Sequence, residues 1–300
     1  MILFFVGYIY VNADRYLRLF SFSVDLIVLL VGLIAAGIVL RGLINYFLYR
    51  VFMINLTIVE STGLAVINTL ANLLPFTGGL IAKGVYLKKR HQLSYSLYLP
   101  ATVALFTCFI SINGLVGLLG VLYLNFILST PKPAVFILIY LLMTACMGLL
   151  WVPWRIDLLP AKWAEKISQA KNGWQCFRQN PRLLINTISL QILSVLLGAL
   201  RLFIVFNIMS QEIPFIYCIL FSSAIILTQL VNITPDAIGF REVLVGGLTS
   251  MVGFQFDTSI FAVAIDRLVT MFIIFLAGIF YARYFSRVSF TATSKKCMNP

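Results

Sequence analysis

The chain has 300 residues, of which 61% are hydrophobic and 11% are charged, against roughly 25% charged residues in soluble domains. A mean hydropathy of +1.00 leaves too little polar surface to cover a globule in water, so a water-soluble fold is excluded. The net charge of +12 comes from lysines and arginines that border apolar runs, which is the pattern of a membrane protein rather than of a nucleic-acid-binding surface.

Apolar runs long enough to cross a bilayer, about 20 residues each, recur along the chain. They predict helices over residues 24–48, 57–74, 95–128, 134–152, 183–209, 214–233 and 258–283. The shorter runs 1–11 and 238–253 are crossings or partial crossings, which gives about seven to nine passes. We therefore predict an all-α integral membrane protein, a polytopic helical bundle that forms a single transmembrane domain over residues 1–300.

A basic segment, residues 153–182, divides the chain into two hydrophobic halves, 1–152 and 183–285, which are followed by a tail over 286–300. Lysine and arginine are concentrated in this linker, in the tail and in a segment at 88–91 that we expect to be a loop. Because positive charge marks the cytoplasmic side of a membrane protein, we expect all three to be cytoplasmic.

Within the linker, apolar residues recur at spacings of four and three, and basic residues occupy the other faces. The apolar set is Trp163, Ile167, Ala170, Trp174 and Phe177. This period predicts a basic amphipathic helix that lies on the cytoplasmic membrane surface. A helix that docks on a partner protein is the weaker alternative.

The sequence gives little support for metal or redox chemistry. The five cysteines are scattered, mostly in or beside apolar runs, which predicts buried thiols rather than a disulfide frame or a metal site. His91 is the only histidine, so a zinc or iron centre built on imidazoles is excluded. No cofactor is expected, and no Walker motif supports coupling to ATP.

Two stretches inside apolar sequence, one in each half, share the pattern Asn-x-x-Pro-x-x-x-Gly. Proline removes a backbone donor and glycine loosens the chain, so a helix breaks at both places. The residues expected to form the breaks and to line a cavity between them are Asn72, Pro75, Gly78, Gly79, Asn232, Pro235 and Gly239. Broken helices at matching positions of two halves point to a substrate site near the bilayer midplane. The two asparagines are expected to cap the exposed backbone groups, and the pattern leaves open whether the halves are parallel or inverted.

Charged residues inside apolar runs are expensive and need a reason. The candidates for binding a lipid headgroup are Lys83, Arg201, Arg241, Glu242, Asp266 and Arg267, with Asp236 beside the second break. Arg241 opens a half-helix after Gly239, where free N–H groups, the helix dipole and a guanidinium all favour a phosphate. Lys83 follows the first break and would act as a point charge. The alternative is mutual neutralisation within the doublets Arg241–Glu242 and Asp266–Arg267.

Other charges have two interpretations each. Arg201 either lies on a polar path or reaches the outer interface, and Glu60 either stabilises the start of the helix 57–74 or has a function. Arg41 and Arg50 come near the end of the helix 24–48 and are expected to extend to the interface. No Ser-x-x-Lys, Gly-x-Ser-x-Gly or His-Glu-x-x-His pattern is present, so a catalytic role is not expected.

The two breaks lie in blocks that resemble a known family. The stretch NTLANLLPFTGGLIAKGVYLKKRHQLSYSLYL resembles the Asn-x-x-Pro-x-x-x-Gly-(acid)-x-x-Arg block of the lysylphosphatidylglycerol synthase transmembrane-region family. The stretch QLVNITPDAIGFREVLVGGLTSMVGF, with DRLVTMFIIFLAGIFY after it, resembles that family's second block, whose positions here are Pro235, Gly239, Arg241, Glu242, Gly253 and Arg267. The first block departs from the pattern, because Leu80 replaces the frequent glutamate and Lys83 the arginine.

The resemblance implies the flippase half of bacterial proteins that add lysine to phosphatidylglycerol, or a stand-alone relative in the plasma (inner) membrane of a bacterium or archaeon. No soluble synthase domain follows, so aminoacyl transfer is not expected. We expect the protein to translocate a polar or charged lipid between leaflets, with membrane lipid as its partner. The alternatives are a membrane-embedded lipid-modifying transferase or its lipid-presenting subunit, and a scaffold in envelope assembly. A partner enzyme is expected with the transferase alternative, a homodimer stays open for each of them, and no nucleic acid is expected.

Overall fold

We describe the protein from a computed structural model, which describes residues 24–50, 54–73, 78–93, 95–126, 134–146, 179–230 and 235–297. The predicted run 1–11, nearly all of the linker 153–182, Pro75 and Asn232 lie outside the described residues. The described α-helices are α3 (Val24–Arg50), α4 (Ile58–Ala71), α5 (Gly78–His91), α6 (Tyr95–Phe126), α7 (Ala134–Ala145), α10 (Pro181–Ile208), α11 (Phe215–Ala224), α12 (Phe240–Ser250) and α13 (Phe256–Cys297). Two 3-10 helices, η2 (Ile225–Leu230) and η3 (Pro235–Ala237), flank the second break. The all-α fold class is confirmed.

Four of these helices are long and apolar enough to cross a membrane. They are Val24–Arg50, Leu105–Phe126, Leu184–Ile208 and Phe256–Phe285. Three further apolar helices, α4, α7 and α11 with part of η2, are shorter. The runs 57–74 and 214–233, which we expected to be crossings, are therefore too short as helices to span a bilayer by themselves.

The first break separates two antiparallel half-helices. Thr57 caps the start of α4 by accepting a hydrogen bond from the Glu60 amide at 3.2 Å. The Glu60 carboxylate contacts Arg90 and His91 in the last turn of α5. The outer ends of α4 and α5 thus lie together, and the chain turns back at the break inside the bundle. Residues 88–91, expected to be a loop, are helical because no proline or glycine ends α5 before His91.

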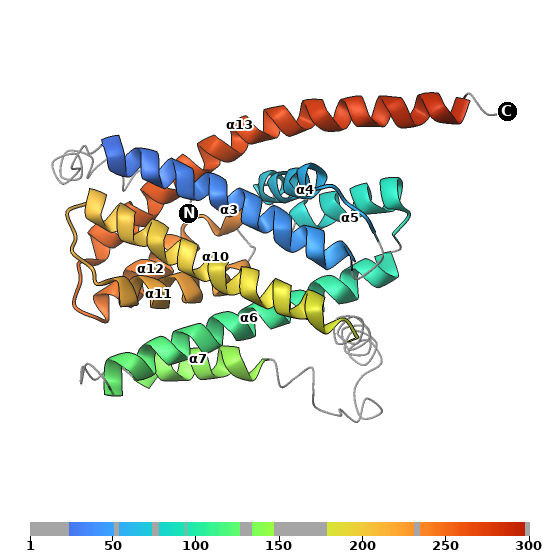
Figure 1. The fold of residues 1–300 in the computed structure, drawn as a ribbon. Coiled ribbons are helices and arrows are strands. Elements are labelled where there is room, and N and C mark those ends of the chain that lie inside the picture. Colours follow the sequence, from blue (N-terminus) through green and yellow to red (C-terminus); the bar gives the residue numbers. More distant parts are fainter. Residues whose placement is uncertain are drawn as a thin grey trace.

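The second break is at the tip of a hairpin that enters from the opposite end. The rings of Tyr217, near the start of α11, and Phe254, just after α12, lie 6.0 Å apart. The outer ends of this hairpin therefore meet near the start of α13. Figure 1 shows the hairpin of α4 and α5 on one side of the bundle and that of α11 and α12 on the other. The two hairpins have inverted orientation, which answers a question that the sequence left open.

Glycines let helices approach closely around the first hairpin. A Cβ on Gly42 of α3 would lie 2.7 Å from the Thr62 Cα of α4, and a Cβ on Gly278 of α13 would lie 2.3 Å from Leu70. Gly63 of α4 faces aromatic rings of α13 in the same way. Small residues at crossings let membrane helices pack tightly, so α4 is fixed between α3 and α13.

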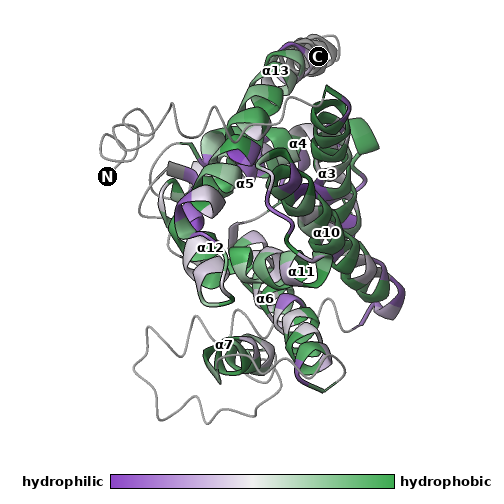
Figure 2. Cartoon of the chain, turned by 90° about the vertical axis from the view of Figure 1, so that its left-hand side faces the viewer, coloured by the Kyte–Doolittle hydropathy of each residue, from purple (hydrophilic) through white to green (hydrophobic). Residues whose placement is uncertain are grey.

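The remaining core joins α6 and α7 to the second hairpin. Gly114 and Gly117 of α6 face Met143 and Tyr140 of α7, so these two helices pack closely. The buried Tyr140 hydroxyl donates to the Leu220 carbonyl of α11 at 2.6 Å. Figure 2 shows hydrophobic residues along the outsides of the long helices and hydrophilic residues where α3, α4, α5 and α12 approach the middle.

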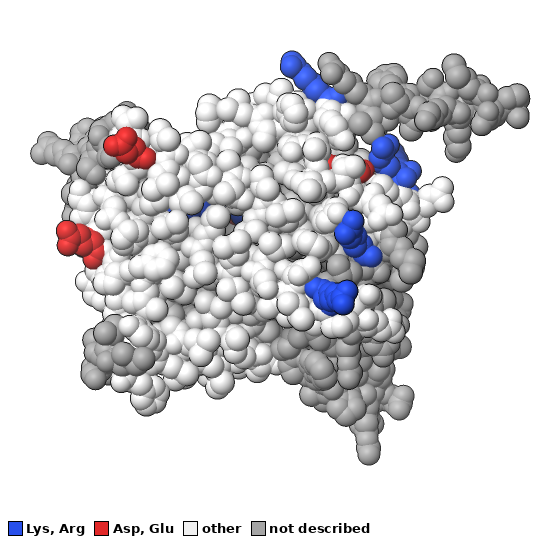
Figure 3. Space-filling model, in the orientation of Figure 1, with Lys and Arg blue, Asp and Glu red and all other residues white. Residues whose placement is uncertain are grey.

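Charge differs between the two ends of the bundle. The end where α3 and α5 finish and α10 begins carries exposed basic residues, and Figure 3 shows them gathered there. They are Arg50, Lys88, Lys89, Arg90 and Arg182. The opposite end carries the exposed acidic residues Asp25 and Glu212. We call these the basic end and the acidic end.

The last helix is longer than predicted. α13 continues to Cys297, although we expected a tail over 286–300 after a helix that ends at residue 283. No glycine or proline follows Gly278 before residue 298, so nothing in the sequence stops the helix. Figure 1 shows α13 extending beyond the rest of the bundle.

Candidate functional site

The tips of the two hairpins touch. The Asp236 amide, at the second break, donates to the Asn72 carbonyl, at the end of α4, over 2.9 Å. The Asn72 side chain accepts a hydrogen bond from the Gly79 amide at 3.0 Å and so caps α5. The two motifs that are about 160 residues apart in sequence are therefore joined directly, as inverted repeats are at a central site.

The second break has an unusual backbone. Asp236, Ala237 and Gly239 have φ values of 47°, 54° and 85°, a region that L-residues other than glycine avoid. Arg267 of α13 holds this turn, since its guanidinium donates to the Ala237 carbonyl at 3.2 Å and to the Asp236 carbonyl. It also pairs with the Asp236 carboxylate at 2.9 Å. Arg267 is therefore a residue that positions the break.

Glu242 uses both carboxylate oxygens within the protein. One oxygen accepts from the Gly239 amide at 2.8 Å and caps α12, and the other accepts from Arg267 at 3.1 Å. The residue is 1% exposed. With its acceptors occupied and its side chain buried, Glu242 fixes the start of α12 against α13.

Asp266 of α13 is shared by two arginines from different helices. Arg201 of α10 binds both of its oxygens, at 2.7 and 2.9 Å, and also donates to Thr270 at 2.5 Å. Arg241 of α12 reaches the same carboxylate at only 3.4 Å, and its Nε is buried without a hydrogen-bond partner among the described residues. Arg241 is thus weakly satisfied, whereas Arg201 is held firmly.

Arg41 of α3 faces the same group of charges. It interacts electrostatically with Arg201, Arg241, Asp236 and Asp266, yet makes no hydrogen bond or ion pair with any residue that the structure describes. It is exposed, although α3 continues for nine residues beyond it, roughly 13 Å of helix. Figure 3 shows basic side chains set below the surface in the uncharged middle of one face.

The expectation that Arg41 reaches the interface at the end of a helix is therefore wrong. Arg41 lies nine residues before the end of α3, and its electrostatic partners are residues around the second break. Arg50, at the last position of α3, is exposed and lies 4.4 Å from the Tyr46 ring centroid, as expected for a side chain at the interface.

We call the seven residues around the second break the charged centre. They are Arg41, Arg201, Asp236, Arg241, Glu242, Asp266 and Arg267. Four arginines face three acidic residues, which leaves one positive charge in excess. The two members of a doublet do not neutralise each other, because Arg241 pairs with Asp266 and Glu242 pairs with Arg267. An arginine-rich group with one excess charge is suited to a phosphate.

Lys83 lies apart from the charged centre. Its Nζ donates to Asn45 Oδ1 of α3 at 2.7 Å and lies 5.5 Å from the Tyr49 ring centroid. Both of these contacts are with α3, and among the described residues Lys83 contacts no member of the charged centre.

Glu60 has a third role, which the sequence did not suggest. One of its oxygens accepts from the Tyr86 hydroxyl at 2.5 Å and Arg90 at 3.2 Å, and lies 3.0 Å from the His91 ring nitrogen. These contacts clamp the start of α4 to the end of α5. Among the described residues no group of histidine, cysteine and acidic side chains could hold a metal ion.

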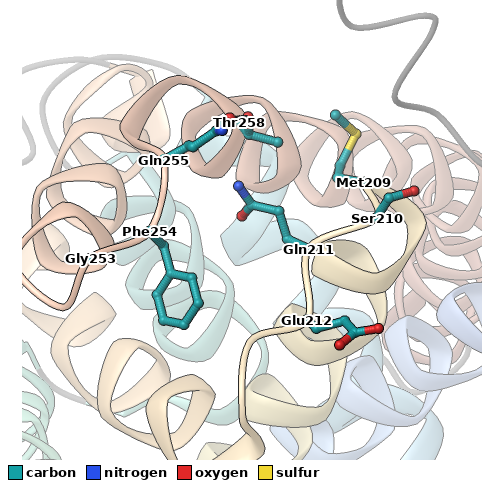
Figure 4. A pocket seen from close by; sticks show the side chains of 8 residues that line it. All are labelled: Met209, Ser210, Gln211, Glu212, Gly253, Phe254, Gln255 and Thr258. Carbon is teal, nitrogen blue, oxygen red and sulfur yellow. Dashed lines mark hydrogen bonds between the residues drawn. The ribbon is translucent and has the colours of Figure 1, made fainter.

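A cavity of about 280 Å³ lies elsewhere, at the acidic end. It is formed by the connection from α10 to α11 and the connection from α12 to α13, and Figure 4 shows Gln211 and Phe254 on its two sides. Its lining contains none of the residues of the charged centre.

Several residues of the site were missed in the sequence. Arg41, Asn45, Tyr49 and Thr270 approach the predicted residues only through folding, although Arg41, Asn45 and Tyr49 share a helical face at spacings of four. The positions of Pro75 and Asn232 lie outside the described residues. Binding of a headgroup by any of these residues stays a prediction.

Inverted half-helices that meet at a polar centre, within a bundle of long apolar helices, define the chain as a multi-pass membrane protein. Comparison with family models then places the chain. It belongs to the family of the lysylphosphatidylglycerol synthase TM region, whose model matches residues 2–278, as the two blocks had indicated. No curated protein and no solved structure matches the chain.

Proposed function

We propose that this protein moves a phosphate-bearing lipid between the two leaflets and binds the headgroup at Arg41, Arg201 and Arg241. The observation that carries the proposal is the meeting of two oppositely inserted half-helix hairpins at a centre with an uncompensated arginine. A lipid headgroup could reach such a centre alternately from each side of the membrane if the hairpins or the surrounding helices move.

The donors that remain free suit a phosphate. Arg41 makes no described hydrogen bond, and Arg241 has a buried Nε without a partner in the described part of the chain. An anion between these two guanidiniums would satisfy donors that Asp266 leaves unmet. Arg241 also stands in the first turn of α12, where the helix dipole favours negative charge.

The contacts divide the predicted headgroup residues into two roles. Arg41, Arg201 and Arg241 would face the ligand, while Glu242 and Arg267 would hold the break and the start of α12. Asp266 would keep Arg201 in place and would give up its long contact with Arg241 to the ligand.

A lipid-modifying transferase is the alternative, and the contacts support it less well. Its acid or base would be a carboxylate of the charged centre, yet Asp236, Glu242 and Asp266 each pair with an arginine. We propose no catalytic role. We also propose that the basic end is cytoplasmic and that the protein lies in the plasma membrane of a bacterium or archaeon.

The test is transport in liposomes. Protein in phosphatidylcholine vesicles with a small fraction of fluorescent phosphatidylglycerol would be probed with a quencher that reaches the outer leaflet alone. Arg41→Met and Arg241→Met each remove donors for a charge-assisted hydrogen bond, so we expect rates lower by about 10-fold or more. Arg50→Met removes an exposed arginine of the same helix as Arg41 and should leave the rate unchanged.

Two results would contradict the proposal. One is a rate equal to that of protein-free vesicles for phosphatidylglycerol and for its lysyl derivative. The other is full transport by both the Arg41 and Arg241 variants, which would remove the charged centre from the mechanism.

A further inference from the structure

Lys83 is a cation without a counter-ion in a region of apolar helices. Its described partners are the neutral amide of Asn45 and the Tyr49 ring. Leu80, one turn earlier on α5, is apolar, so its own helix supplies no acid at that spacing. The nearest acid along the facing helix is Glu60, which is taken by Tyr86, Arg90 and His91. A charge left uncompensated in such a place is expensive and marks a function.

A second polar group next to Lys83 also lacks a partner. The Tyr49 hydroxyl is buried and makes no hydrogen bond with any described residue, and Tyr49 is 1% exposed. Buried hydroxyl groups normally find a partner. Lys83 keeps two donors beyond the one that Asn45 accepts. The site therefore offers an ammonium group, an amide and a hydroxyl, and no negative charge.

Helix α3 shows where this site lies. Arg41, Asn45 and Tyr49 follow one another at spacings of four on one face, and Arg50 ends the helix at the basic end. Asn45 is thus about 6 Å along the helix from Arg41, on the side of the basic end. Lys83 likewise precedes the basic residues that end α5. The site stands between the basic end and the charged centre.

We propose that Lys83, Asn45 and Tyr49 form a second binding site for an anionic phosphate group, distinct from the charged centre. Lys83 supplies the charge and Tyr49 donates its hydroxyl to the ligand. Asn45 Nδ2 donates to the Ser61 carbonyl at 3.4 Å, which holds Asn45 Oδ1 against Lys83 and positions the ammonium group. This inference rests on the proposed function in assigning the phosphate to a lipid, which would occupy the second site after leaving the leaflet at the basic end.

Binding by purified protein tests the second site. Soluble dihexanoylphosphatidylglycerol, inorganic phosphate and the phosphate-free dihexanoylglycerol would be titrated by equilibrium dialysis in detergent. The wild type should bind two equivalents of the phospholipid and none of the diacylglycerol. Inorganic phosphate that competes at the Lys83-dependent site shows that the phosphate group alone is recognised, and phosphate that does not compete shows that the lipid is required. Both results support the site.

The variants separate this site from the charged centre. Lys83→Met should lose one equivalent. Asn45→Asp places a carboxylate against Lys83 and should also lose one, although it adds an ion pair and should not unfold the protein. Lys89→Met removes an exposed lysine of the same helix and should keep both equivalents. Lys83→Arg should keep both as well.

The second site is overturned if Lys83→Met and Asn45→Asp both bind two equivalents with wild-type affinity. The proposed function fails separately if the Arg41→Met and Arg241→Met variants each bind two equivalents and transport lipid at the wild-type rate. In that case Lys83→Met would still lose one equivalent. The two failures therefore give different patterns of stoichiometry.

Discussion

The ion pair between Arg201 and Asp266 is expected to stabilise the bundle, and it can be tested by neutralising each partner. Asp266 is 1% exposed and receives Arg201 on both oxygens, at 2.7 and 2.9 Å. Asp266→Asn keeps the shape of the side chain but removes its charge. The charged centre would then hold four arginines and two acidic residues, whereas the wild type holds four arginines and three acidic residues.

The size of the effect follows from the burial of the pair. Removing one partner of a buried ion pair costs about 3–5 kcal/mol, because the other charge stays buried without compensation. A loss of this size lowers the melting temperature by on the order of 10 °C in a chain of this length. Arg201→Met should cost about as much. The double variant removes both charges, so it should be more stable than the sum of the single losses by about 2 kcal/mol or more.

The assay is thermal unfolding in detergent, followed by fluorescence-detected size-exclusion chromatography. Glu212→Gln, which neutralises an exposed acid at the acidic end, is the matched control and should melt like the wild type. Strictly additive losses in the double variant would show that the two side chains do not pair in the folded protein. The contact between α10 and α13 through Arg201 and Asp266 would then be wrong.

Two further predictions concern the glycines. Gly42→Ala places a Cβ 2.3 Å from Thr62 Oγ1 and 2.7 Å from its Cα, so it should lower stability in thermal unfolding by about 1–3 kcal/mol. The control Gly32→Ala places a Cβ with no atom within 4 Å and should leave stability unchanged, so equal melting temperatures of the two variants would contradict the close approach of α3 and α4. Gly239→Ala forces an L-residue to a φ of 85°, so it should lower the stability of the folded protein by about 1–2 kcal/mol. The control Gly247→Ala, at an open position of the helix α12 that follows, should leave stability unchanged or raise it by up to about 1 kcal/mol.

The fold class and both helix breaks could be predicted from the sequence because they depend on local properties. Run length and hydropathy indicate membrane helices, and a proline followed closely by glycine inside an apolar run favours a helix break. The direction in which α4 and α11 enter the bundle could not be predicted in this way. A short apolar helix has the same composition whether it crosses the membrane or turns back, and only Asn72 bonded to Asp236 shows that the tips meet.

The pairing of the charges could be predicted only in part. Adjacent residues on a helix point about 100° apart, so Arg241 cannot easily neutralise Glu242, nor Asp266 neutralise Arg267. Pairing within the doublets nevertheless stayed an alternative in the sequence analysis, and the structure shows pairing between them. The sequence did not reveal that Arg201 would take Asp266, because that choice depends on how α10 packs against α13. Arg41 was assigned to the interface instead of the charged centre for the same reason.

The two unmatched cations, Arg41 of α3 and Lys83 of α5, lie beside the same face of α3, and this arrangement has a consequence. Arg41 faces the charged centre, and Asn45, one turn away, holds Lys83. The described acids near these cations are already paired with other groups. Inside the bilayer an unpaired charge is retained only where water or an anion compensates it. A phosphate that passes along α3 would meet one unpaired cation and then the next. Attraction to the second cation would lower the free-energy cost of leaving the first. Two separated cations therefore suit movement of an anionic headgroup, whereas one clamp formed by both would suit tight binding.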